Sequence, residues 1–151
     1  MSGFQISWTI EGEKQLSRTL QGLSTSVKDF RKPLTQSANR LISVFSRDVF
    51  DSEGGAIAEK WARLSPHTVA QKARLGYGSK GILERTGKMR RSFDSVVEST
   101  QAVIGNTAEY FKYHQSNQAR SGRLPRRVMM KLAENQKQMV VKFFQDYIRN
   151  L

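Results

Sequence analysis

The feature that most limits how this chain can fold is an apolar stripe through its first third. Apolar residues recur there at steps of three and four, the spacing of one face of an α-helix. The stripe consists of Leu16, Leu20, Leu23, Val27, Phe30, Leu34, Ala38, Leu41, Phe45 and Val49. Pro33 interrupts it, because proline lacks a backbone donor and disfavours helix at the preceding residue. We expect two helices, or one helix kinked near residues 31–33, with Pro33 in the first turn of the second.

The stripe keeps its phase across Pro33, which favours a kink or a tight joint over a long loop. A coiled-coil seam is the alternative interpretation of the same spacing.

Strands are predicted at the start of the chain and beyond its middle. Phe4, Ile6, Trp8 and Ile10 alternate with polar residues, the period of a half-buried strand. Residues 93–98 and 101–105 are β-branched runs joined at Ser99-Thr100, which predicts an antiparallel hairpin.

The remaining elements are short helices and one final helix. Ser65-Pro66 is typical of an N-cap followed by proline at the first helical position, so a helix is expected to run to about Leu75. Residues 82–91 predict a short helix or helical turn in which Gly87 marks a terminus or a close backbone approach. Residues 107–115 predict a helical turn at the sheet edge. The last helix is expected to begin at Pro125 and to bury Val128, Met129, Leu132, Met139, Val140, Phe143, Phe144, Tyr147 and Ile148.

This order predicts a single α+β domain over residues 1–151: a small antiparallel sheet packed on long N-terminal helices and a C-terminal helix. Residues from about 51 to 81 contain several glycines and few apolar positions, so they are expected to form a long basic loop. A loop of this length is usually functional or ordered by a partner. We expect it to be mobile in an isolated subunit, with Trp61 and Tyr77 as aromatic anchors for an interface.

Charge is distributed unevenly along the chain. The formal net charge is +12, and residues 60–91 carry nine basic side chains against Glu84 alone. Such asymmetry indicates a polyanionic neighbour, either nucleic acid or an acidic protein surface. The basic residues predicted to face a partner are Lys72, Arg74, Lys80, Arg85, Lys88, Arg90, Arg91, Arg120, Arg123, Arg126 and Arg127.

The chain lacks the residues that several kinds of functional site require. The stretch from Gly81 to Ser92 resembles a phosphate-binding loop, but five residues separate Gly81 from Gly87 and Met89 replaces the metal-binding hydroxyl. With no cysteine and with His67 and His114 far apart, no metal site is predicted. We predict no catalytic residue, no cofactor, no signal peptide and no membrane span.

Several fragments, taken in order, resemble the tailed-phage virion-morphogenesis or tail-completion family, of the Mu-like G and tail-completion S type. The resemblance covers roughly residues 55–150. The fragments are Trp61-x-x-Leu64-Ser65-Pro66-x-Thr68 with Lys72, Ile82-Leu83-x-x-Thr86-Gly87-x-Met89-x-x-Ser92, Ile104-Gly105, Tyr110-x-x-Tyr113-His114-Gln115 and Leu124-Pro125-x-Arg127. Two local departures stand out: Ser116-Asn117 where the family usually has Gly, and Val128-Met129 where it usually has Pro-Phe.

The resemblance implies a structural protein of the virion, assembled in the host cytoplasm, that completes the tail or neck and joins head to tail. It implies a homo-oligomeric ring whose neighbours are neck, tail-terminator or tail-tube proteins, with possible contact with packaged DNA, and it implies no catalysis. The alternative is a basic protein that binds DNA without sequence specificity. An enzymatic interpretation is weakest, because no grouping of residues supports it.

Overall fold

A long helix is the centre of the fold. The computed structural model describes residues 5–8, 29–115 and 125–150. Helix α2 (Arg31–Ser43) continues through a π-helical segment, η1 (Val44–Asp48), into α3 (Val49–Asp51). Pro33 lies in the first turn of α2, as predicted. The part of the predicted stripe before residue 29 lies outside the described residues, and so does the choice between a kink, two helices and a coiled-coil seam.

The second half of the stripe is the core face of this helix, as its spacing predicts. Five residues of the stripe are at most 1% exposed, namely Leu34, Ala38, Leu41, Phe45 and Val49. The stripe thus supplies one wall of the hydrophobic core.

A three-stranded antiparallel sheet packs against one side of α2. Its strands are β1 (Gln5–Trp8), β2 (Phe93–Val97) and β3 (Ala102–Asn106), in the order β1-β3-β2. Ile104 of β3 pairs with Ile6 on one side and with Ser95 on the other. The predicted hairpin and N-terminal strand are confirmed, although Phe4 and Ile10 lie outside the described residues. The predicted α+β class is also confirmed.

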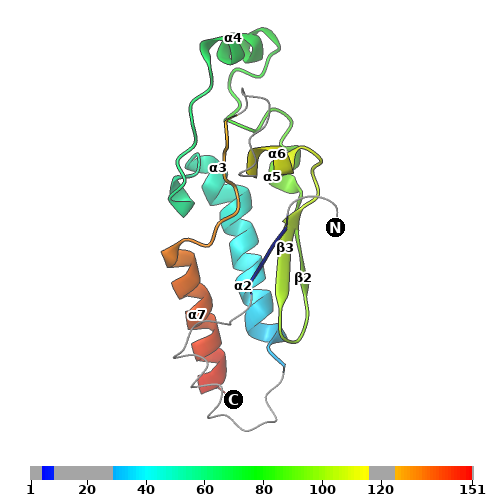
Figure 1. Ribbon diagram of the computed structural model, residues 1–151, viewed down its shortest axis with the longest axis vertical. Helices are drawn as coiled ribbons and strands as arrows, with labels where there is room; N and C mark the ends of the chain where they lie inside the picture. The colour runs from blue at the N-terminus through cyan, green and yellow to red at the C-terminus, as the bar shows by residue number, and fades with distance from the viewer. Residues whose placement is uncertain (1–4, 9–28, 116–124, 151) are drawn as a thin grey trace.

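The C-terminal helix α7 (Glu134–Arg149) covers the other side of α2, so that α2 lies between α7 and the sheet (Figure 1). The ring centroids of Phe30 and Phe144 are 5.8 Å apart, and the Tyr147 hydroxyl donates to the Asp29 carbonyl at 2.9 Å. On the sheet side, the ring of Phe93 lies 6.2 Å from that of Phe45. Aromatic contacts therefore join all three layers.

The prediction that the last helix begins at Pro125 is wrong. Residues 125–133 are extended, and α7 begins at Glu134. Val128, Met129 and Met130 are buried one after another, which a single helix face cannot achieve. Backbone groups of Met129 and Met130 bond to the side chain of Gln115 in place of a helical turn.

The predicted long loop at residues 51–81 contains more structure than expected. It includes the short 3₁₀ helix η2 (Gly55–Ile57) and helix α4 (Pro66–Arg74), and both Ile57 and Trp61 are buried in the core. A Cβ atom at Gly54, where φ is +87°, would lie 2.0 Å from the Glu59 carbonyl oxygen, so this tight turn requires glycine. The predicted mobility of this segment in an isolated subunit stays a prediction.

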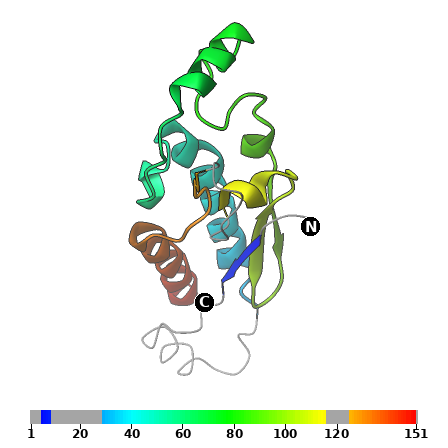
Figure 2. The same ribbon diagram turned by 45° about the horizontal axis from the view of Figure 1, so that its top comes forward.

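Helix α4 stands at one end of the molecule, beyond α3 (Figures 1 and 2). Its predicted cap is confirmed, because the Ser65 side chain accepts a hydrogen bond from the Thr68 amide and Pro66 occupies the first helical position. None of its residues is buried. We call residues 62–81 the arm. In the described ranges, no helix is long and apolar enough to cross a membrane.

Candidate partner-binding site

Trp61 lies at the root of the arm, where the arm joins the core. Its indole Nε1 donates to the Val128 carbonyl at 2.7 Å, and its ring meets Phe50 edge-on with the centroids 5.3 Å apart. The side chain is 4% exposed. Trp61 is therefore buried within the single chain, and its predicted contact with a partner stays a prediction. A buried indole needs an apolar site with one acceptor, and the chain itself supplies both.

Arg127, in the segment that precedes α7, holds the root of the arm as well. Its guanidinium donates to the Ala62 carbonyl from Nε at 3.0 Å and from Nη2 at 2.9 Å. Arg127 is 4% exposed, and burial lowers its pKa from the ordinary value. Its Nε and Nη2 atoms thus donate inside the chain, and the predicted partner-facing role of Arg127 stays a prediction.

Gln115 joins helix α6 (Phe111–Gln115) to the extended segment that carries Arg127. Its Oε1 accepts from the amides of Met129 at 2.8 Å and Met130 at 3.1 Å, and its Nε2 donates to the Met130 carbonyl at 2.7 Å. The neighbouring His114 carbonyl accepts from the Arg127 amide at 2.9 Å. One amide side chain thus takes the place of a pairing strand.

His114 is half-buried beside this joint. Within the described residues its Nδ1 atom is buried and has no hydrogen-bond partner. Burial, and then the charge of Arg127, lower the pKa of His114 below its ordinary value.

The Thr86-Gly87 turn leads into helix α5 (Lys88–Arg91). Gly87, at φ +72°, is its N-cap, so the predicted helix terminus at this glycine is confirmed. Met89 is buried, and Leu83 packs partly buried against the core at a φ of +62°. The buried side chain of Asn106 fixes the turn, since its Nδ2 donates to the Met89 carbonyl at 2.7 Å.

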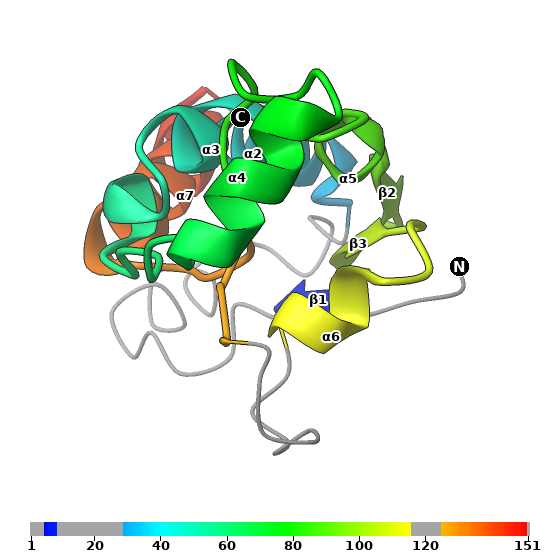
Figure 3. The ribbon, with the colours of Figure 1, turned by 90° about the horizontal axis from the view of Figure 1, so that it is seen from above.

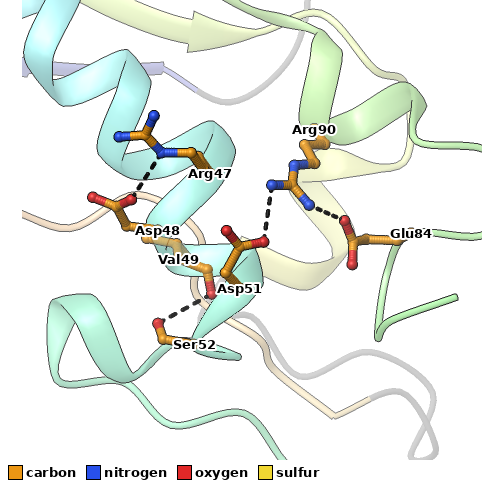
Figure 4. Close-up of polar contacts among 7 residues, drawn as sticks. All are labelled: Arg47, Asp48, Val49, Asp51, Ser52, Glu84 and Arg90. Carbon is orange, nitrogen blue, oxygen red and sulfur yellow. Dashed lines mark hydrogen bonds and ion pairs between the residues drawn. The ribbon is translucent and has the colours of Figure 1, made fainter.

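Arg90 belongs to an internal ion-pair network (Figure 4). Its guanidinium contacts Asp51 at 2.9 Å and also pairs with Glu84, and these carboxylates raise its pKa. Its side chain is 28% exposed. Arg90 therefore joins the end of α3 to the turn before α5, which differs from its predicted role as a free cation facing a partner.

A surface cavity of about 450 Å³ opens between the arm and helices α5 and α6. The guanidinium of Arg85 lies 4.8 Å from the ring centroid of Tyr77, and the Lys88 ammonium lies 5.9 Å from that of Tyr110. Each pair is a cation–π contact. The cavity is lined by Tyr77, Leu83, Arg85, Thr86, Met89, Tyr110 and His114. Aromatic surface next to cations suits an acidic or aromatic group of a partner.

Residues 12–149 match the sequence model of the phage virion morphogenesis family. The chain belongs to this family. Searches against curated proteins and against solved structures return no match.

In this member of the phage virion morphogenesis family, the motif residues differ in what they do and in how far they are buried. Ser65, Pro66, Gly87 and Gln115 shape the backbone, through a cap, a first helical turn, a left-handed turn and an amide bridge. Leu64, Leu83 and Tyr110 pack partly buried against the core, and Ser92 is half-buried after α5, whereas Thr86 and Pro125 are exposed. Of the two departures, Val128-Met129 is buried, and Ser116-Asn117 lies outside the described residues.

The basic residues that were predicted to face a partner also differ in their exposure. Lys72 is half-buried, because its Nζ donates to the carbonyls of Lys80 at 2.7 Å and Gly81 at 3.0 Å and so closes the arm. Arg120 and Arg123 lie outside the described residues. The predicted partner-facing cations that are exposed are Arg74, Lys80, Arg85, Lys88, Arg91 and Arg126.

Sequence patterns did not reveal Asn106, Met130 or Gln136. Gln136, buried on α7, donates from Nε2 to the Ala56 carbonyl at 3.1 Å. A buried polar residue carries no periodic signal of its own. Among the described residues, no group of three or more His, Cys, Asp or Glu side chains is placed to hold a metal ion.

Proposed function

We propose that this protein is a non-enzymatic structural component that completes the tail or neck of a phage particle and joins head to tail as a homo-oligomeric ring. Membership of the phage virion morphogenesis family over residues 12–149 carries the proposal. Neck, tail-terminator or tail-tube proteins would be its neighbours in the virion.

The distribution of apolar contacts supports an assembled state. Helix α4 buries no residue within its own chain, although it carries Val69 and is followed by Leu75 as its C-cap, both exposed. A ring subunit keeps such surface for its neighbours.

The exposed cations give partial support to the alternative function, that of a basic protein that binds DNA without sequence specificity. Six of the predicted partner-facing cations are exposed, and they could contact DNA phosphates in a channel or an acidic protein surface. A protein that acts by binding DNA alone would be retained on duplex DNA at low salt and released steeply as salt rises.

Deletion of the gene from a phage or an inducible prophage tests the proposal. We expect full heads and separate tails by electron microscopy, because the joint would be incomplete. Expression of the intact protein in trans is the matched control and should restore joined particles. Particles that lack the protein but still carry firmly attached tails would contradict the proposed function.

A further inference from the structure

Three large hydrophobic side chains stand out on the surface of the described residues. Val69 is 53% exposed, Leu75 46% and Val96 55%. Val69 and Leu75 belong to the arm, and Val96 lies in strand β2. Single exposed apolar residues are ordinary, but these lie on two surfaces whose charges are opposite.

The arm is held in place by polar contacts. Ser65 caps α4, Lys72 closes the arm onto Lys80 and Gly81, and Arg127 fixes its root at Ala62. These bonds position the arm without covering the apolar residues of α4. The arm is therefore a projecting surface that the chain orients and leaves open.

The arm is purely basic. Residues 62–81 contain Arg63, Lys72, Arg74 and Lys80 and no Asp or Glu. Arg63, Arg74 and Lys80 are exposed, so their charges are available to a neighbour.

The outward face of β2 is acidic. The strand alternates, with Phe93, Ser95 and Val97 partly buried and with Asp94 and Val96 exposed. Glu98 follows and is exposed as well, so Val96 lies between two carboxylates. None of the ion pairs among the described residues uses Asp94 or Glu98.

One chain does not bring these two surfaces together. Helix α4 lies across one end of the molecule, whereas β2 lies along its side, and the side and top views agree on this separation (Figures 1 and 3). A contact between two different surfaces joins copies head to tail, and such contacts close into rings when the rotation permits.

We propose that the arm of one copy docks on the outward face of β2 of the next copy, with Val69 and Leu75 against Val96 and with Arg74 and Lys80 facing Asp94 and Glu98. This inference rests on the proposed ring and names the surfaces that form it. Complementary charge selects the neighbouring copy, and the three apolar side chains exclude water from the contact.

Cysteine cross-linking tests the contact, because the chain has no cysteine of its own. Val69→Cys combined with Val96→Cys should form a ladder of covalent multimers on oxidation, since each copy offers one thiol to each neighbour. Either single variant should give no ladder beyond a dimer. A matched control pairs Val96→Cys with Lys142→Cys on the exposed side of α7, which should give no ladder.

Charge reversal provides a second readout. Asp94→Lys with Glu98→Lys should weaken self-association at least tenfold in analytical ultracentrifugation, and Arg74→Glu with Lys80→Glu in the same chain should restore it. The control Glu109→Lys with Glu134→Lys adds the same charge at exposed acidic positions elsewhere and should leave association unchanged.

The outcomes separate this inference from the proposed function. Rings that survive the reversal and give no Val69–Val96 ladder would overturn the arm–β2 contact while leaving the ring intact. A wild-type protein that never self-associates, alone or on isolated tails, would overturn both.

Discussion

Gln115 shows at the residue scale how one side chain can replace a secondary-structure element. Its amide satisfies two backbone N–H groups and one carbonyl of residues 129–130. Gln115→Ala would leave these buried groups without partners, so we expect it to lower the free energy of unfolding by about 2–4 kcal/mol. Urea unfolding followed by circular dichroism measures this change.

Gln138→Ala on the exposed side of α7 is the matched control, and it should shift the unfolding free energy by less than about 0.5 kcal/mol. Equal effects of the two substitutions would show that the amide bridge contributes no particular stability.

We expect His114 to make the stability depend on pH. Burial and Arg127 lower its folded pKa, so the unfolded chain binds the proton more readily. Stability from this group is therefore fully present above the unfolded pKa of about 6.5 and is lost as pH falls toward the folded pKa. We expect His114→Gln to reduce the loss of stability between pH 7 and pH 5, measured by thermal unfolding at each pH. His67→Gln on α4 is the control, and an identical pH profile for both variants would contradict the prediction.

At the scale of elements, the arm should open independently of the core. Lys72 closes it through two hydrogen bonds from one ammonium, and α4 buries no residue. We expect Lys72→Met to speed hydrogen exchange at the amides of Tyr77 and Lys80 roughly tenfold, with little change in global stability. Arg74→Met is the matched control, because this side chain is exposed on the same helix. Amides of the arm that exchange only through global unfolding would refute independent opening.

Elements with a local sequence signal were predictable. The stripe through Leu34 and Phe45, the hairpin around Ser99-Thr100 and the cap at Ser65 depend on spacing and on neighbouring residues alone. The segment after Pro125 was not predictable. Its residues favour a helix, but the side chain of Gln115, from the preceding helix α6, bonds to their backbone instead.

The candidate site was predictable in composition more than in arrangement. Sequence identifies cations, but it does not show that Arg90 meets Asp51, 39 positions away, or that Arg127 meets the Ala62 carbonyl. Such long-range pairs decide which charges remain for a partner. Only the fold shows which cations on the arm and near the Thr86-Gly87 turn are exposed.

At the scale of the whole molecule, charge limits the assembly. The formal charge of +12 on each chain already counts every Asp and Glu, so the copies of a ring would repel one another unless DNA or acidic surfaces of other proteins offset the charge. In the proposed ring, the acidic outward face of β2 would give local attraction to the basic arm of the next copy, and DNA or other virion proteins would offset the net charge.

The root of the arm also sets an order in time. Trp61 depends on the Val128 carbonyl, 67 positions later, and Ala62 depends on Arg127, 65 positions later. During translation these contacts form only after residue 128 has left the ribosome. A nascent chain therefore cannot fix its arm before residues 127 and 128 are available, and the proposed association through the arm would wait for that point.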